Sequence, residues 1–160
     1  SIVPAQAVAV STQSSLASLP AMLHVAAKSL EHPLRVPSLV LPMAVSLFRL
    51  TSPVQYIVVA SFIAWTQGVH LGPVQLLIAI SLAVVVSLGS VGLPGQASFI
   101  ATNMPITNAM GLPVEPLGVL LAVDTIPDVF ATLGNVTGDL AATSVVAKGE
   151  GADASDADSA

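Results

Sequence analysis

The chain has 160 residues, of which 54% are hydrophobic and 8% are charged, and its formal net charge is −5. Because this composition is too apolar for a soluble domain of that length, we expect an all-α membrane protein. Four of the nine acidic residues lie in the last stretch, 148–160, which we expect to be a disordered acidic tail, so the net charge indicates no partner. The lack of cysteine excludes disulfides, thiolate nucleophiles and cysteine metal sites.

The first 66 residues predict a helical hairpin followed by a membrane span. In residues 1–30, two short apolar arms flank the Ser-rich turn "STQSSLASLP". Residues 36–66 exceed the roughly 20 mostly apolar residues that a bilayer span needs. Lys28 and Arg35 precede this span and Lys148 follows the last apolar segment. The positive-inside rule therefore predicts that this end of the span and the C-terminus are cytoplasmic.

The second half of the chain repeats the same order. Residues 72–110 predict another hairpin, whose arms flank the tip "SLGSVGLPGQ", and residues 114–147 predict a second span. A two-fold repeat of hairpin and span is typical of secondary transporters. Broken backbone is tolerated at membrane depth only where protein or water satisfies its polar groups, so the Gly/Pro tip is a candidate binding loop. An ordinary kink in a transmembrane helix is the alternative.

The last span carries a polar face. Five polar residues follow one another at spacings of 4, 4, 3 and 4, which places them within an arc of roughly 80° on a helix. A carboxylate at bilayer depth costs at least about 2.5 kcal/mol, so we expect this face to meet a cation, a substrate amine or a wet cavity. A helix end that displays solvated acids is the alternative. The five residues are Asp124, Asp128, Thr132, Asn135 and Asp139.

Four segments resemble the dicarboxylate/amino acid:cation symporters, a family that includes the glutamate transporter homologues. They are "STQSSLASLP", "LVLPMAVSLFRLTSPVQY", "SLGSVGLPG" and "DTIPDVFATLGNVTGDL". The resemblance implies two re-entrant helical hairpins and two broken transmembrane helices in an inverted repeat. Residues 1–147 would form part of the transport domain, with hairpin 1 at about 1–30, helix 7 at 36–66, hairpin 2 at 72–110 and helix 8 at 114–147. It also implies that upstream scaffold helices are missing and that the intact protein is a homotrimer.

The resemblance assigns roles to residues of this chain. Asp128 and Thr132 would hold the amino group of the substrate, while Asn135 and the backbone near Ser15 would hold its α-carboxylate. One Na⁺ would bind Asn135, Asp139 and a carbonyl near Ala44. The carbonyls that would hold a second Na⁺ belong to Ser46, Ser87, Leu88 and Ser90. The tip of hairpin 2 would be the gate, with Gly92, Pro94 and Gly95.

The chain departs from the family at two positions that matter for specificity. Ala131 stands where members that take acidic amino acids carry an arginine, which weakens the prediction of an acidic substrate. At the break in helix 7, Phe48 and Leu50 replace an Asn and an Asp that serve ion sites, so we expect at least one ion site to be lost or altered. Between them, Arg49 would either bind a substrate carboxylate or pair with Asp124 or Asp128.

These features predict a symporter, or its substrate-binding half, that moves an amino acid or small carboxylate with Na⁺ or H⁺ across the cytoplasmic membrane. A truncated, non-transporting membrane fragment, or a regulatory partner of a full-length transporter, is the alternative. Ser14 and Ser15 have no base placed to activate them and the sequence has no phosphate loop, so we do not expect an enzyme. We also expect no organic cofactor and no nucleic-acid partner.

Overall fold

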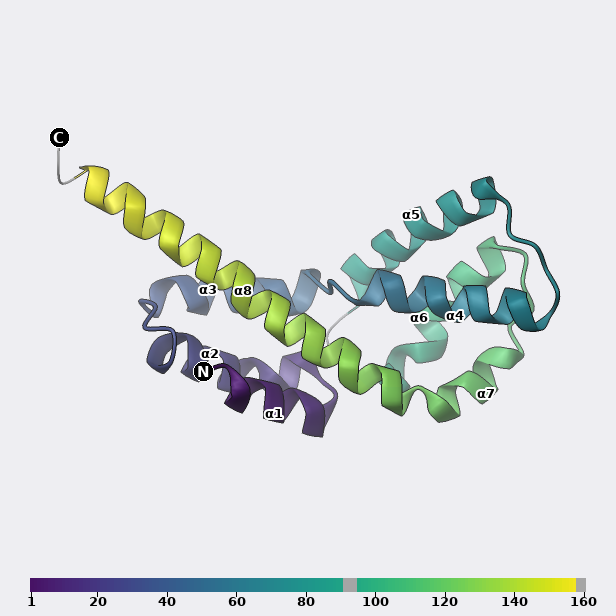
Figure 1. Ribbon diagram of the computed structural model, residues 1–160, viewed down its shortest axis with the longest axis horizontal. Coiled ribbons are helices and arrows are strands. Elements are labelled where there is room, and N and C mark those ends of the chain that lie inside the picture. The colour runs from purple at the N-terminus through teal and green to yellow at the C-terminus, as the bar shows by residue number, and fades with distance from the viewer. Residues whose placement is uncertain (91–94, 158–160) are drawn as a thin grey trace.

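The computed structural model describes residues 1–90 and 95–157, and within these ranges all regular structure is helical (Figure 1). The prediction of an all-α protein is therefore confirmed for the described residues. The first four helices are α1 (Val3–Thr12), α2 (Ser15–Lys28), α3 (Arg35–Leu47) and α4 (Ser52–Thr66). The remaining four are α5 (Pro73–Gly89), α6 (Gly95–Ala109), α7 (Pro116–Val123) and α8 (Thr125–Ala157).

The turn between α1 and α2 is built from local polar contacts. Gln13 takes a left-handed conformation, with φ of 50°, and its N–H bonds the carbonyl of Ala9, which ends α1. Ser14 then begins α2, because its hydroxyl accepts a hydrogen bond from the N–H of Ala17 at 3.2 Å. Gln13 and Ser14 thus end α1 and begin α2, and the two helices pack against each other.

Two of the apolar segments are broken helices. Residues 48–51 separate α3 from α4, and Asp124 separates α7 from α8. By length and composition, Arg35–Thr66 and Thr125–Glu150 can each cross a membrane. The chain therefore runs twice through the same order of elements, namely two packed helices and then a broken helix.

The helices pack as two lobes, and each broken helix contributes one half to each lobe. The first lobe consists of α1, α2, α3 and α8, and the second of α4, α5, α6 and α7 (Figure 1). Both breaks consequently lie where the lobes meet. The core of the first lobe is formed by Ala5, Ala9, Met22, Val25, Ala26, Leu41, Val45, Val136 and Leu140. The core of the second is formed by Tyr56, Ala60, Ile63, Ala64, Ala79, Ala83, Phe99, Ile106, Met110, Leu112 and Leu117.

Two glycines of α8 let the break at 48–51 approach the helix backbone. A Cβ atom on Gly134 would lie 2.6 Å from Cγ2 of Thr51, a distance at which atoms overlap. A Cβ atom on Gly138 would lie 3.3 Å from Cδ2 of Leu50. A side chain at position 134 would therefore displace Thr51, whereas one at position 138 would require only a small shift of the Leu50 side chain.

The outer surface is rich in apolar side chains. Trp65, Val74 and Val119 are each at least 70% exposed, and other large apolar residues lie on the outer faces of α3, α5 and α8. Exposed apolar area of this extent suits contact with lipid or with further protein. It agrees with the membrane protein that the composition predicts.

The C-terminal stretch is described in part. Residues 148–160 were expected to be a disordered tail; α8 continues through Ala157, and residues 158–160 lie outside the described residues. Helical hydrogen bonds join residues four apart, so a stretch that contains several alanines can extend a helix without tertiary contacts. The acidic composition alone therefore does not end the helix at Lys148.

Candidate functional site

The polar face of α8 is buried. Asp124, Asp128, Thr132, Asn135 and Asp139 are each at most 2% exposed. A helix end that displays solvated acids is therefore excluded for these side chains. Buried carboxylates are stable only when hydrogen bonds or positive charges compensate for the loss of water, so the contacts of each one decide what the site can bind.

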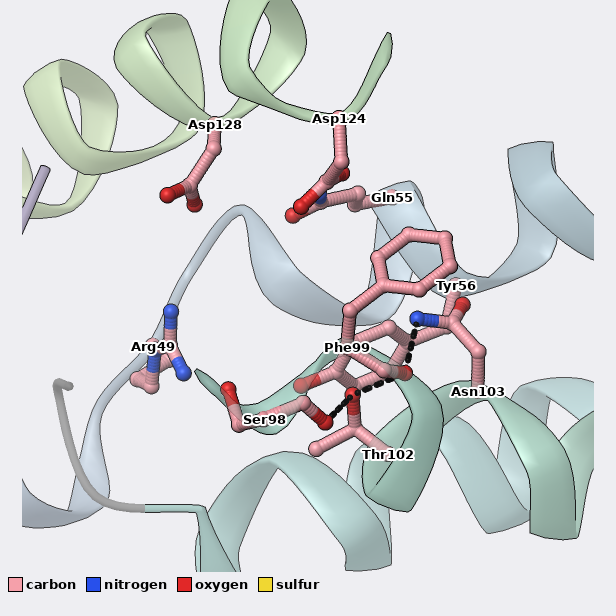
Figure 2. A pocket seen from close by; sticks show the side chains of 9 residues that line it. All are labelled: Arg49, Gln55, Tyr56, Ser98, Phe99, Thr102, Asn103, Asp124 and Asp128. Atoms are coloured by element: carbon pink, nitrogen blue, oxygen red, sulfur yellow. Dashed lines mark hydrogen bonds between the residues drawn. The ribbon is translucent and has the colours of Figure 1, made fainter. Parts of the chain in front are cut away.

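Two of the carboxylates open onto a small polar cavity where α4, α6 and α8 meet. In Figure 2, Asp124 and Asp128 extend from α8 toward the side of the cavity that carries Arg49 and the polar residues of α6. Its volume is about 10 Å³, close to the room that one water molecule needs. The lining residues are Arg49, Gln55, Tyr56, Ser98, Phe99, Thr102, Asn103, Asp124 and Asp128.

Several cavity residues were not predicted as site residues. Gln55 of α4 donates a hydrogen bond from Nε2 to Oδ1 of Asp124 at 3.0 Å. On α6, Nδ2 of Asn103 donates to the carbonyl of Phe99 at 2.9 Å, and the Thr102 hydroxyl lies 3.2 Å from the same oxygen. The available signal was the adjacent pair Thr102 and Asn103 in an otherwise apolar stretch.

Thr51 in the first break anchors Asn135. Its backbone N–H donates to Oδ1 of Asn135 at 3.0 Å. Its hydroxyl lies 3.0 Å from that oxygen and 2.9 Å from the carbonyl oxygen of Ala131, either of which can accept the single hydroxyl proton. These bonds orient the amide, and its Nδ2 is buried without an acceptor among the described residues. Asn135 therefore presents an unused donor, and its oxygen keeps a second lone pair for Na⁺ when the Thr51 hydroxyl donates to Ala131 instead.

Asp139 is the most isolated of the buried acids. Both of its carboxylate oxygens are buried, and neither has a hydrogen-bond partner in the ranges that the structure describes. Arg49 is a positive charge that acts on it through space. An anion in this position favours a nearby cation, because a buried charge without compensation is strongly destabilising.

Comparison with known sequences identifies the family. The sequence model of the sodium:dicarboxylate symporter family matches residues 1–149. The chain belongs to this family. The resemblance seen in the sequence is thereby confirmed, and the family is one of membrane transporters rather than enzymes.

Named relatives of this symporter-family chain are amino acid transporters. It is 33% identical to excitatory amino acid transporter 3 of Mus musculus over 84% of the chain and 25% of that protein. It is 31% identical to an excitatory amino acid transporter of Caenorhabditis elegans over 86% of the chain and 27% of that protein. It is 33% identical to neutral amino acid transporter A of Homo sapiens over 83% of the chain and 25% of that protein. The chain thus spans about a quarter of the length of these relatives.

One of the residues expected around a second Na⁺, Ser90, contacts Arg49 in this symporter-family chain. The carbonyl of Ser87 accepts the Ser90 hydroxyl at 3.1 Å, and Nη1 of Arg49 donates to that hydroxyl oxygen at 3.4 Å. The side chain of Ser46 is exposed and donates to Pro42, and Leu88 is also exposed, so these two could contribute only backbone carbonyls. The ends of α3 and α5 nevertheless meet here.

The other expected residues divide into described and undescribed positions. Ser15 is buried at the start of α2, which packs against α8. Ala44 is buried on α3, and its carbonyl accepts the N–H of Phe48 at 2.7 Å. The gate residues Gly92 and Pro94 lie outside the described residues, and Gly95 is described only as the first residue of α6.

Proposed function

We propose that the intact protein is a secondary active transporter that carries an amino acid across the cytoplasmic membrane together with Na⁺ or H⁺. The observation that carries this proposal is the buried acidic face of α8, where both oxygens of Asp139 lack a partner among the described residues. A cation supplies the missing charge there. The names of the family and of the relatives, which are sodium symporters and amino acid transporters, support the same activity.

The substrate would bind between Asp128 and Asn135. Asp128 faces the cavity and can attract an ammonium group, with the Thr132 hydroxyl one turn away on the same face. Nδ2 of Asn135 is an unused buried donor, which suits the α-carboxylate of an amino acid. The N-terminus of α2, where Ser15 lies, would add backbone N–H groups and the positive end of the helix dipole.

The coupling cation would bind at Asp139. A carboxylate and backbone carbonyls are the ligands that hard cations prefer, and Ala44 lies on α3, which packs against α8. Participation of the Asn135 oxygen in this ion site would require the Thr51 hydroxyl to donate to the carbonyl of Ala131, while the Thr51 N–H bond is kept. The same carboxylate could accept a proton, so coupling to H⁺ remains the second form of the proposal.

Binding requires the site to open. A cavity of about 10 Å³ holds about one water molecule and cannot hold an amino acid. Hairpin 2, formed by α5 and α6, is the proposed gate, because α6 supplies Ser98, Thr102 and Asn103 to the cavity wall. Alternating access would also need upstream scaffold helices for this domain to move against. The family resemblance further suggests a homotrimer, and the positions of Lys28, Arg35 and Lys148 suggest a cytoplasmic C-terminus.

Uptake by the complete gene product in proteoliposomes tests this function. Labelled amino acids should accumulate when a Na⁺ or H⁺ gradient is imposed and should only equilibrate when it is absent. A lack of both binding and uptake for every amino acid under both gradients would contradict the proposal. That result would favour the alternative of a non-transporting fragment or regulatory partner.

A further inference from the structure

Arg49 is a buried cation in an unusual place. It lies in the break between α3 and α4 and is only 7% exposed, whereas the other three Lys and Arg residues of the chain are exposed. Its Nη1 donates one long hydrogen bond, of 3.4 Å, to the Ser90 hydroxyl, and its Nε has no partner among the described residues. Hydrogen bonds to neutral groups therefore do not account for the burial of this guanidinium.

Negative charge surrounds Arg49 on two sides. On one side are acids at the break before α8 and on α8, because Asp124 and Asp128 line the same cavity as Arg49 (Figure 2). Asp139 of α8 lies within range of the same charge. On the other side is the C-terminal end of α5, where Ser90 is the cap residue. The last carbonyls of a helix have no partner within the helix and carry the negative end of its dipole, which favours a cation.

We infer that Arg49 is a tethered cation that takes the place of one free coupling cation between the end of α5 and the buried acids of α8. This inference rests on the proposed function, and it places the guanidinium beside the hydroxyl of Ser90, one of the residues expected around a second Na⁺ from the resemblance. Because Arg49 is covalently part of the break, its positive charge is always present. It compensates the negative charge of the buried acids without the binding of a free ion. The protein therefore needs one free cation fewer than a site without this arginine.

Replacement of Arg49 by methionine tests the inference, because it removes the charge and keeps an unbranched apolar chain. The complete gene product is purified, and its melting temperature is measured while NaCl replaces choline chloride at constant ionic strength. In R49M the melting temperature should rise with Na⁺ by at least about 2 °C more than in the unaltered protein. The logarithm of amino acid affinity plotted against the logarithm of Na⁺ concentration should also have a slope that is larger by about one, which corresponds to one additional bound Na⁺.

Two single variants serve as controls. R49K keeps a positive charge at the break and should retain most of the unaltered response to Na⁺. R35M removes an exposed arginine at the start of α3 and should not change the response at all. If R49M gained no additional dependence on Na⁺ relative to R35M, the inference would be overturned.

A double variant covers the case in which R49M does not fold. R49M/D139N removes one positive and one negative buried charge, so it should regain the melting temperature in choline chloride that R49M has lost. Failure of this rescue would overturn the inference. If R49M lost only the binding of acidic amino acids, at every Na⁺ concentration, Arg49 would be a substrate ligand and the inference would also be overturned. The melting temperatures test the role of Arg49 even if no amino acid binds. A failure of the proposed function can therefore be distinguished from a failure of this inference.

Discussion

At the scale of single residues, the buried polar atoms of the site differ in whether they have hydrogen-bond partners. Thr51 holds the Asn135 oxygen and Gln55 holds one oxygen of Asp124, while both oxygens of Asp139 lack partners among the described residues. Burial of a hydrogen-bonded group costs little free energy, whereas a buried carboxylate without a hydrogen-bond partner is stabilised by binding a cation. The ion is therefore expected at Asp139 rather than at Asp124.

Asp139→Asn should abolish cation-driven uptake. The substitution keeps the shape of the side chain and removes the charge that would attract Na⁺ or H⁺. Uptake in proteoliposomes, with and without a cation gradient, measures the effect. Glu31→Gln removes an exposed acid and should leave uptake unchanged. Unaltered Na⁺ dependence in Asp139→Asn would rule out the proposed ion site.

Thr51→Val should weaken substrate binding by roughly tenfold, because a mispositioned buried amide loses the value of about one good hydrogen bond. Valine cannot donate its side chain to Asn135, although its backbone N–H remains. Equilibrium binding of labelled amino acid gives the affinity. Thr66→Val is the matched control, since the Thr66 hydroxyl donates to the carbonyl of Ile63 within α4 and, among the described residues, to no residue of the site. Equal effects of the two substitutions would argue against the Asn135 assignment.

At the scale of elements, the breaks bring side chains from separate helices to one place. Residues 48–51 leave the helical path and deliver Arg49 and Thr51 to the face of α8. Gly134 and Gly138 make room for this approach. The function of the glycines is thus steric, and it can be tested apart from the chemistry of the site.

Gly134→Ala should destabilise the protein by about 1–3 kcal/mol, because the new methyl group overlaps Thr51 and must displace the break. Gly118→Ala on α7 meets no atom within 4 Å, so it should be neutral or stabilise by up to about 1 kcal/mol. Melting temperatures of the two variants in the same detergent measure the difference. A tolerated alanine at Gly134 would show that the break can move without cost.

At the scale of the whole molecule, the two halves of the chain are interleaved. The first broken helix contributes α3 to the first lobe and α4 to the second. The second broken helix contributes α7 to the second lobe and α8 to the first. A movement of one lobe against the other would therefore act on both breaks at once. This arrangement suits a binding site that must open and close as a unit.

The proposed topology can be tested with single cysteines, because the chain has none of its own. Arg35→Cys and Lys148→Cys should react with a membrane-impermeant maleimide only from the cytoplasmic side. His70→Cys, in the exposed loop between α4 and α5, should react only from the outer side. Labelling of His70→Cys and Arg35→Cys from the same side would contradict a span between them.

The sequence by itself determined the helical class, the membrane environment, the family and the polar face of α8. These properties follow from composition, from the spacing of residues along one helix and from motifs, all of which are local in the chain. Tertiary structure alone decided which acids are satisfied. Thr51 reaches Asn135 across 84 positions, and Gln55 reaches Asp124 across 69. Such contacts depend on how the lobes pack, and neither spacing nor propensity records that packing.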